Sequence, residues 1–101
     1  MSLTTDRNDP ELHITEDSGM QRKYLILSEE ERNKGFVRAI QQDYIHDTCG
    51  GETHMGLALS ETYARDPKFY GATFCVHCGN HFPVGEDGEF TWTKSRMKVG
   101  T

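Results

Sequence analysis

The pattern of apolar positions along the chain predicts one amphipathic helix in the middle of the sequence. Its larger side chains recur at positions i, i+3, i+4, i+7 and i+8, namely Met55, Ala58, Leu59, Thr62 and Tyr63. This period of about 3.6 residues predicts a helix over about residues 54–65, with Thr53 as its N-cap. The pair Asp66-Pro67 ends the helix, because the residue before a proline is pushed out of the α region and proline cannot donate the next hydrogen bond.

Two extended segments are predicted before this helix. Residues 23–27 form a short β-prone apolar run that leads to Ser28 and Glu31, whose S-x-x-E spacing predicts a brief helical turn ended by Gly35. Residues 36–46 have mixed polarity on both faces, which favours an extended segment and leaves a helix as the alternative.

Two more short strands are predicted after the helix, over residues 72–74 and 89–92. One helix combined with short antiparallel strands predicts an α+β fold. The ends of the chain are polar: residues 1–22 have no periodic apolar pattern and predict a flexible N-terminal arm, and residues 94–101 predict a polar, weakly basic tail. The globular domain is therefore expected over residues 23–93.

The length and hydropathy of the chain limit its class. It has 101 residues, 35% hydrophobic and 27% charged, which suits one small domain. No stretch approaches the roughly 18 to 20 apolar residues that cross a bilayer, and residues 1–19 are polar where a secretory leader would be apolar. We therefore expect no membrane association and a cytoplasmic location.

Charge and cysteine content narrow the chemistry further. Eleven Lys and Arg residues face sixteen Asp and Glu residues, a formal net charge of −5, which disfavours a nucleic-acid partner and favours a protein partner. Three cysteines cannot all pair in disulfides, whereas five histidines are available to join them in a metal site. A domain this small often needs such a site to be stable.

Two short segments of the same form carry the candidate chemistry: H-D-T-C-G at residues 46–50 and C-V-H-C-G at residues 75–79. Each places two metal-ligating side chains three positions apart, so that a tight turn directs both to one point, and each ends in a glycine that lets the chain leave the turn. Together they predict a tetrahedral Cys₃His site that suits zinc. The predicted ligands are His46, Cys49, Cys75 and Cys78.

The fourth ligand is the least determined member of this set. The matching H-x-x-C-G and C-x-x-C-G turns favour His46, while His81, in a C-x-x-C-x-x-H spacing, and His54 are the alternatives. His77 lies inside the second turn and is expected to face solvent. His13 lies in the predicted arm and is expected to play no part.

The stretch from His46 to Trp92 resembles a zinc ribbon, because of its paired turns. Zinc ribbons usually carry four cysteines, and here His46 stands in place of the first. The segments C-G-G, E-T-Y-A-R-D-P, F-Y-G-A-T-F-C and H-F-P-V are similar to small uncharacterised proteins of bacteriophages and mobile elements. This resemblance implies a phage or mobile-element setting but no known activity.

Four protein ligands leave no open position for water, so the first hypothesis is a structural zinc site in a non-enzymatic module for protein interaction or regulation. An alternative is a zinc ribbon that binds nucleic acid through a local basic cluster of Lys94, Arg96 and Lys98.

Two further alternatives use the cysteines differently. In a hydrolase or deaminase-like enzyme, Glu52 would carry protons beside a Cys₃–water site. However, Glu52 misses the deaminase spacing by one position, and Phe74 stands where that signature has proline. In a thiol switch, Cys75 and Cys78 would form a redox pair, but they follow a predicted strand and do not begin a helix.

Overall fold

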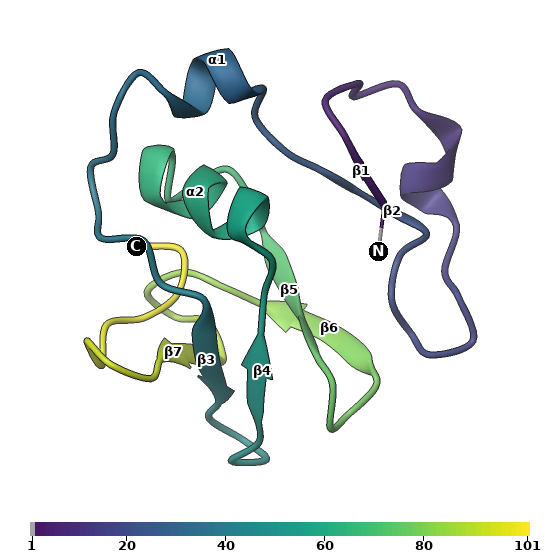
Figure 1. Cartoon of the computed structure of the whole chain (residues 1–101). Coiled ribbons are helices and arrows are strands. Elements are labelled where there is room, and N and C mark those ends of the chain that lie inside the picture. Colours follow the sequence, from purple (N-terminus) through teal and green to yellow (C-terminus); the bar gives the residue numbers. More distant parts are fainter. Residues whose placement is uncertain (1) are drawn as a thin grey trace.

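A three-stranded antiparallel sheet forms one part of the structure, a computed structural model that describes residues 2–101 (Figure 1). Its strands are β3 (Asp43–His46), β4 (Glu52–His54) and β7 (Phe90–Trp92), in the order β4-β3-β7. In the central strand, Tyr44 lies opposite a residue of each neighbour, so its side chain is enclosed and only 2% exposed.

A separate antiparallel hairpin lies beside this sheet. It consists of β5 (Ala72–Cys75) and β6 (Asn80–Pro83). β4 and β5 lie next to each other, although they belong to different sheets (Figure 1). A side chain bridges the two layers, because the Tyr44 hydroxyl donates a hydrogen bond of 2.5 Å to the carbonyl oxygen of Phe74.

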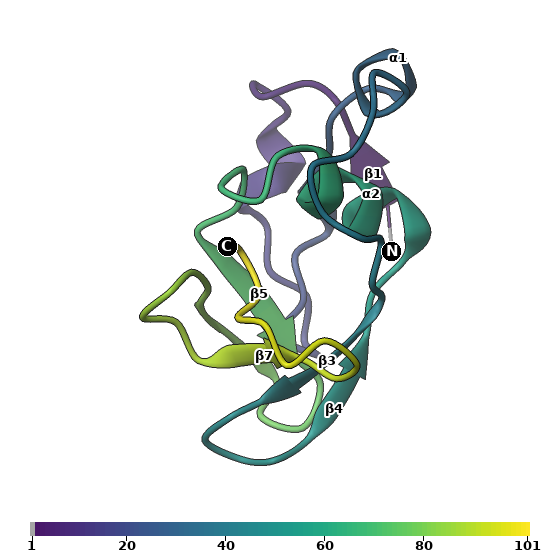
Figure 2. The same ribbon diagram turned by 90° about the vertical axis from the view of Figure 1, so that its left-hand side faces the viewer.

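Helix α2 (Leu57–Arg65) packs over both layers and is shorter than predicted (Figure 1; Figure 2). The prediction of a start near residue 54 with Thr53 as N-cap is wrong, because Thr53 and its neighbours pair with β3 in strand β4. Gly56 is the N-cap instead and offers no side-chain hydrogen bond. The predicted end is confirmed, since Asp66 caps the last turn.

The segment before the sheet is less regular than predicted. Ser28 begins α1 (Glu29–Arg32) by accepting a hydrogen bond of 3.2 Å from the amide of Glu31, as the S-x-x-E spacing predicts. Of the extended segment predicted over residues 36–46, only β3 is a strand. The chain before β3 is held partly by two amides, of Val37 and Arg38, that both donate to the carbonyl of Ala64.

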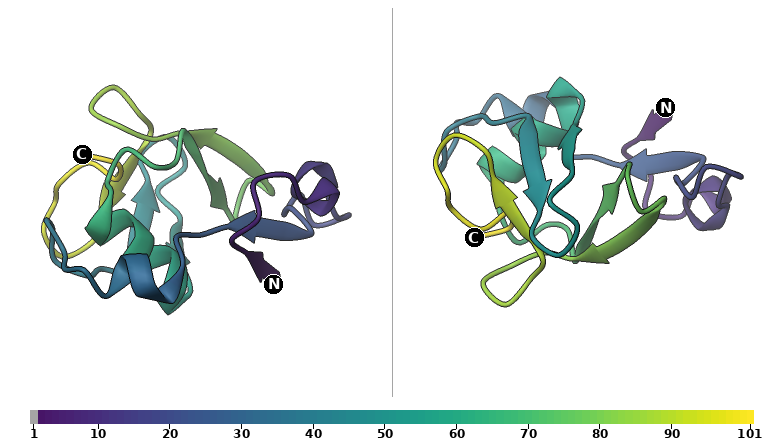
Figure 3. Two further views of the ribbon diagram at one scale, coloured as in Figure 1. Left: turned by 90° about the horizontal axis from the view of Figure 1, so that it is seen from above. Right: turned by 90° about the horizontal axis from the view of Figure 1, so that it is seen from below.

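The N-terminal residues form short elements of their own. β1 (Ser2–Thr4) pairs in parallel with β2 (Lys23–Leu25), and a 3₁₀ turn spans Pro10–His13. This segment packs against the hairpin at Gly19. The backbone there approaches Gly79 so closely that a Cβ atom added to Gly19 would lie only 1.9 Å from the carbonyl oxygen of Gly79. In both views of Figure 3 it lies on the far side of the hairpin from β3 and β7.

The division into an arm over 1–22, a domain over 23–93 and a tail over 94–101 stays a prediction. Met1 lies outside the described residues. Within the predicted arm, residues 2–4 and 10–13 belong to the elements named above, and in the predicted tail Val99 is fully buried. Lys98 also forms a β-bridge with Thr91.

The hydrophobic core lies where α2, the sheet and the hairpin meet. Tyr63 on α2 packs edge-on against Trp92 of β7, with ring centroids 5.8 Å apart, and Tyr44 packs edge-on against the same Trp92. The mixture of helices and antiparallel strands confirms the α+β class. Among residues 2–101, no helix has the length and apolar character that a bilayer crossing requires.

One contact joins the N-terminal segment to the hairpin and is sensitive to pH. The Tyr24 hydroxyl lies 2.8 Å from Nε2 of His81, and burial lowers the pKa of His81. The folded chain therefore keeps the imidazole neutral, whereas the unfolded chain binds a proton near pH 6.5. The stability that His81 contributes is present above about pH 6.5 and is lost as the pH falls below it.

We predict that acidification from about pH 7.5 to about pH 5.5 lowers the free energy of unfolding more in the natural chain than in His81→Gln. Denaturant unfolding of both chains at a constant metal concentration measures this difference. Both chains keep the same cysteines, so the effect of acid on the cysteines cancels in the comparison. His13→Gln, at an exposed position, is the matched control and should follow the natural chain. Equal pH dependence of His81→Gln and the natural chain would contradict the prediction.

Candidate metal centre

The first of the two predicted turns connects β3 to β4. Gly50 donates a hydrogen bond of 2.7 Å back to the carbonyl of His46, which closes the turn over residues 46–50. Gly50 has φ +73°, a left-handed conformation that a side chain disfavours, as the glycine position predicts. The amide of Gly51 then donates to Sγ of Cys49 at 3.3 Å, so the turn also orients the sulfur.

The second turn has the same construction and connects β5 to β6. Gly79 donates a hydrogen bond of 2.9 Å to the carbonyl of Cys75 and has φ +65°. Cys75 is the last residue of β5 and is fully buried, whereas Cys78 is at the exposed side of the turn. Each turn therefore presents one buried and one exposed candidate ligand, because His46 is buried and Cys49 exposed.

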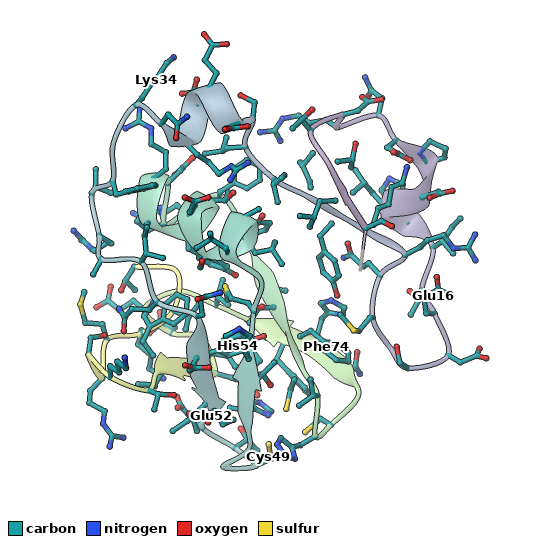
Figure 4. The ribbon with its side chains drawn as sticks, in the orientation of Figure 1. Glu16, Lys34, Cys49, Glu52, His54 and Phe74 are labelled. Atoms are coloured by element: carbon teal, nitrogen blue, oxygen red, sulfur yellow. The ribbon has the colours of Figure 1, made fainter. Side chains whose placement is uncertain are left out.

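The two turns bring all four predicted ligands together. One atom from each of His46, Cys49, Cys75 and Cys78 lies within 4.8 Å of all the others. Sγ of Cys49 lies 3.6 Å from Sγ of Cys75, and Sγ of Cys78 lies 3.6 Å from Nδ1 of His46. Figure 4 shows sulfur atoms gathered near the labelled Cys49, at the ends of β4 and the hairpin.

These distances fit a tetrahedral metal site. Zinc–sulfur bonds of about 2.3 Å and zinc–nitrogen bonds of about 2.0 Å place neighbouring ligand atoms of a tetrahedron about 3.5 to 3.8 Å apart. Both short separations in the cluster, each 3.6 Å, fall in this range. None of the three cysteines forms a disulfide. The four side chains can therefore hold a metal ion.

The electrostatics of the cluster favour a thiolate at one position. The Gly51 amide, helped by neighbouring groups in the cluster, lowers the pKa of Cys49 to about 7. Removal from water, together with the nearby sulfurs, raises the pKa of Cys78 to about 11. The Cys78 thiol therefore loses its proton near neutral pH only beside a compensating positive charge, which a divalent cation would supply.

His46 is buried and in contact with aromatic side chains. It is 1% exposed and its ring packs against those of Phe82 and Phe90, with centroids 4.4 and 4.9 Å away. Its Nε2 lies 2.9 Å from Oε1 of Glu89. This contact directs Nδ1 toward Cys78, because the two ring nitrogens point in opposite directions.

Glu89 is a residue of the candidate site that sequence reasoning missed. A carboxylate on the outer nitrogen of a metal-binding histidine fixes the ring orientation and makes the inner nitrogen a better ligand. Burial lowers the pKa of His46, but Glu89 and Cys49 outweigh it and leave that pKa raised. Glu89 follows a glycine just before β7, and nothing in its local pattern points to His46, which lies 43 positions away.

The remaining histidines lie outside the cluster. His54 is exposed and contacts Asp43 at 2.7 Å, and His81 contacts Tyr24 as described above, so neither alternative fourth ligand joins the sulfurs. His77 is exposed, as predicted, with Nε2 3.2 Å from the carbonyl oxygen of Glu52. His13 ends the 3₁₀ turn of the N-terminal segment.

Comparison with known proteins adds no relative: no protein-family model, curated protein or solved structure matches this chain. The description of the centre therefore depends on its own geometry. That geometry provides a candidate metal centre of three sulfurs and one nitrogen, without identifying the metal.

The contact of Glu89 with His46 generates a specific prediction. Replacing Glu89 with Gln keeps the size of the side chain but removes its charge, so the affinity of the centre for an added metal ion such as zinc should fall about 10- to 100-fold while one ion still binds. Competition with a chromophoric chelator measures the affinity. Glu86→Gln, which removes an exposed carboxylate from the same loop, is the control and should bind like the natural chain. Equal affinities for both variants would mean that Glu89 does not position the ligand.

Proposed function

We propose that this chain is a small zinc-binding module in which the Cys₃His cluster is a structural site, and that the module acts by binding a protein partner. The observation that carries the proposal is the convergence of the four ligand atoms within 4.8 Å of one another. These atoms come from two turns that are separated in sequence and belong to different sheets. A metal ion there would join the sheet and the hairpin.

The donor set favours zinc over other metals. Three sulfurs and an imidazole are soft to borderline ligands, which disfavours magnesium and calcium. Zinc imposes no geometry of its own and accepts this set in a tetrahedron, as structural Cys₃His sites do. The two separations of 3.6 Å within the cluster support that choice.

The arrangement supports a structural role rather than catalysis. Four protein ligands complete a zinc tetrahedron and leave no position for an activated water. The enzyme alternative needs a free His46 and a proton carrier at Glu52. In the structure His46 is buried among aromatic rings, and Oε2 of Glu52 accepts a hydrogen bond of 2.9 Å from Thr93. We therefore propose that the chain is not an enzyme.

The thiol-switch alternative has less support. Cys75 and Cys78 lie at the turn between two strands and do not begin a helix, which is where redox-active cysteine pairs usually lie. The pKa of Cys78 is raised instead, which opposes nucleophilic attack by its thiolate.

The surface supports a protein partner. Phe36, Val37 and Ile40 lie in the irregular stretch before β3 and are 42%, 56% and 41% exposed. Exposed apolar side chains that are close in sequence are typical of contact sites for other proteins. The basic cluster predicted for nucleic acid is weakened, because Lys98 pairs with the carboxylate of Asp47. The net charge of −5 also opposes phosphate binding.

The cellular setting of this module is proposed from sequence resemblance alone. The resemblance of four segments to bacteriophage and mobile-element proteins leads us to propose a setting in the cytoplasm of a bacterial host. There it would act by protein interaction or regulation.

Metal removal tests the structural site directly. The purified chain should contain one zinc ion, and a strong chelator should unfold it, since structural zinc contributes on the order of 10 kcal/mol to folding. Cys49→Ser, Cys75→Ser, Cys78→Ser and His46→Ala should each lose zinc or soluble expression, whereas His54→Ala and His81→Ala should keep zinc. Elemental analysis and circular dichroism before and after chelation measure both properties.

Two outcomes would contradict this proposal. A metal-free chain that keeps its circular dichroism and melting transition would show that the cluster does not stabilise the fold. Zinc that is retained in His46→Ala but lost in His81→Ala would move the fourth ligand to His81.

A pull-down tests the partner. The immobilised, zinc-loaded chain should retain a specific protein from a bacterial lysate, and the double substitution Phe36→Ser with Ile40→Ser should reduce that capture at least tenfold, since few residues dominate most interfaces. Leu57→Ser, which removes another exposed apolar side chain, is the control. Capture that is sensitive to nuclease, or micromolar and salt-dependent binding to duplex or single-stranded DNA, would favour the nucleic-acid alternative.

A further inference from the structure

The irregular stretch before β3 and the loop after β7 lie side by side on one face of the molecule. The amide of Ser95 in the loop donates a hydrogen bond of 3.4 Å to Oε1 of Gln41 in the stretch. Both segments lie on the side of the molecule away from the N-terminal segment (Figure 1; Figure 3). We call this surface, made of residues 38–41 and 94–97, the tail face.

The tail face combines apolar and cationic side chains. Ile40 and Met97 are 41% and 42% exposed. Arg38 and Met97 line one shallow hollow of this face, and Ile40 and Lys94 line a second. Arg96, next to Met97 in the chain, is exposed as well. Each exposed apolar side chain therefore has a positive charge beside it.

The three cations of the tail face have no acidic partner. Elsewhere in the described chain, six of the eleven Lys and Arg side chains form ion pairs with carboxylates, namely Arg22, Lys23, Arg32, Lys34, Arg65 and Lys98. Within residues 2–101, Arg38 donates only to backbone carbonyl oxygens, and Lys94 and Arg96 form no side-chain contact of this kind. Asp43 shares a hollow with Lys94 but contacts His54 instead. Uncompensated positive charge thus gathers on one face of a chain whose net charge is −5.

Arg96 is held in an unfavourable backbone conformation. Its φ is +64°, and no other non-glycine residue of the described chain has a positive φ. A glycine would adopt this conformation without steric cost, and other residues that are kept there are concentrated at functional sites. The Arg96 amide closes the turn by donating a hydrogen bond of 3.0 Å to the carbonyl of Trp92. The strained turn therefore presents an unpaired guanidinium group to the solvent.

The stretch before β3 also leaves peptide groups unpaired. The amides and carbonyls of Ala39 and Ile40 form no hydrogen bond with the described residues, and both residues are exposed. A neighbouring main chain offers a donor and an acceptor to such groups, whereas a phosphate backbone only accepts. Together with the exposed apolar side chains, this favours a peptide over a nucleic acid as the occupant of the face.

We propose that the tail face binds a segment of a protein partner in which carboxylate and large apolar side chains are interspersed. The carboxylates would pair with Arg38, Lys94 and Arg96, and the apolar side chains would cover Ile40 and Met97. Charge complementarity selects this occupant, because an acidic segment is attracted here and repelled by the rest of an acidic chain. The inference rests on the proposed function, since it specifies the chemistry of the protein partner.

Selection from a random peptide library tests the chemistry of the partner. Peptides of about a dozen residues, displayed on phage and panned against the immobilised, zinc-loaded full-length chain, should converge on sequences rich in Asp, Glu and large apolar residues. Fluorescence anisotropy should show that the selected peptides bind the chain in solution and bind more weakly at high salt, which screens the charges. Recovery of no binding peptide, or of peptides without an excess of acidic residues, would overturn the proposal.

Charge reversal locates the binding site. The double substitution Lys94→Glu with Arg96→Glu should weaken the binding of the selected peptides at least tenfold, and Arg38→Glu should weaken it about 3- to 10-fold. All three positions are exposed, so circular dichroism and zinc content should not change. Arg22→Glu, which reverses an exposed arginine of the N-terminal segment, is the control and should keep the affinity. Equal affinities of Arg38→Glu, the double variant and the control would show that the peptides bind elsewhere.

Arg96→Gly separates the strain of the turn from its role in binding. Glycine relieves the positive φ, so this variant should melt at the same or a higher temperature than the natural chain. It should nevertheless bind the selected peptides about 2- to 10-fold more weakly, because it lacks the guanidinium group. Unchanged affinity, or a loss of affinity that is accompanied by a lower melting temperature, would contradict the role of Arg96.

The same variants distinguish failure of this inference from failure of the proposed function. Capture of a lysate protein that survives both charge reversals but is lost in Phe36→Ser with Ile40→Ser would leave a protein partner in place and refute its acidic character. Tighter binding of single-stranded or duplex DNA than of the selected peptides, reduced by the same charge reversals, would assign the tail face to nucleic acid and overturn the inference.

Discussion

The structure depends on the meeting of two turns from layers that share no strand pairing. β3 and β4 belong to one sheet and β5 and β6 to another, and the cluster of three sulfurs and one imidazole lies where the turns of both layers converge. Without a cation, three thiol groups and a histidine would gain little from this proximity and would compete for protons. With a divalent ion, the same proximity becomes a cross-link between layers. Such a cross-link would help a chain of 101 residues with short strands to hold a defined arrangement.

The imidazole and the sulfurs have different supports. Two aromatic rings pack against His46, and Glu89 contacts its outer nitrogen, so these contacts set its orientation without a metal ion. Cys49 and Cys78 are exposed and lie on turns closed by backbone hydrogen bonds. A rigid buried histidine combined with adaptable surface thiols would let a metal enter from the solvent side and complete the site without rearranging the core.

The sequence predicted the local features of this centre and missed those that join distant segments. The two turns and their glycines are visible because a tight turn needs residues at fixed short spacing, as Gly50 and Gly79 confirm. Glu89 was missed because a contact across 43 positions has no local pattern. The start of α2 was misplaced because the helical period begins at Met55, whereas residues 52–54 pair with β3 and the helix begins only at Leu57. The parallel pairing of β1 with β2 is likewise a contact between short, distant segments.

The metal cluster and a small, mainly apolar cavity beside α2 are built on the same two strands, β4 and β5. Cys49 precedes β4 and Cys75 ends β5, while farther along the same strands Thr53 and Thr73 line the cavity. No ladder hydrogen bond sets the separation of these two strands, so side-chain contacts and the cluster must set it, with Val76 donating to Thr53 between them. A metal ion that holds the two turns together would therefore also limit how far β4 and β5 can separate.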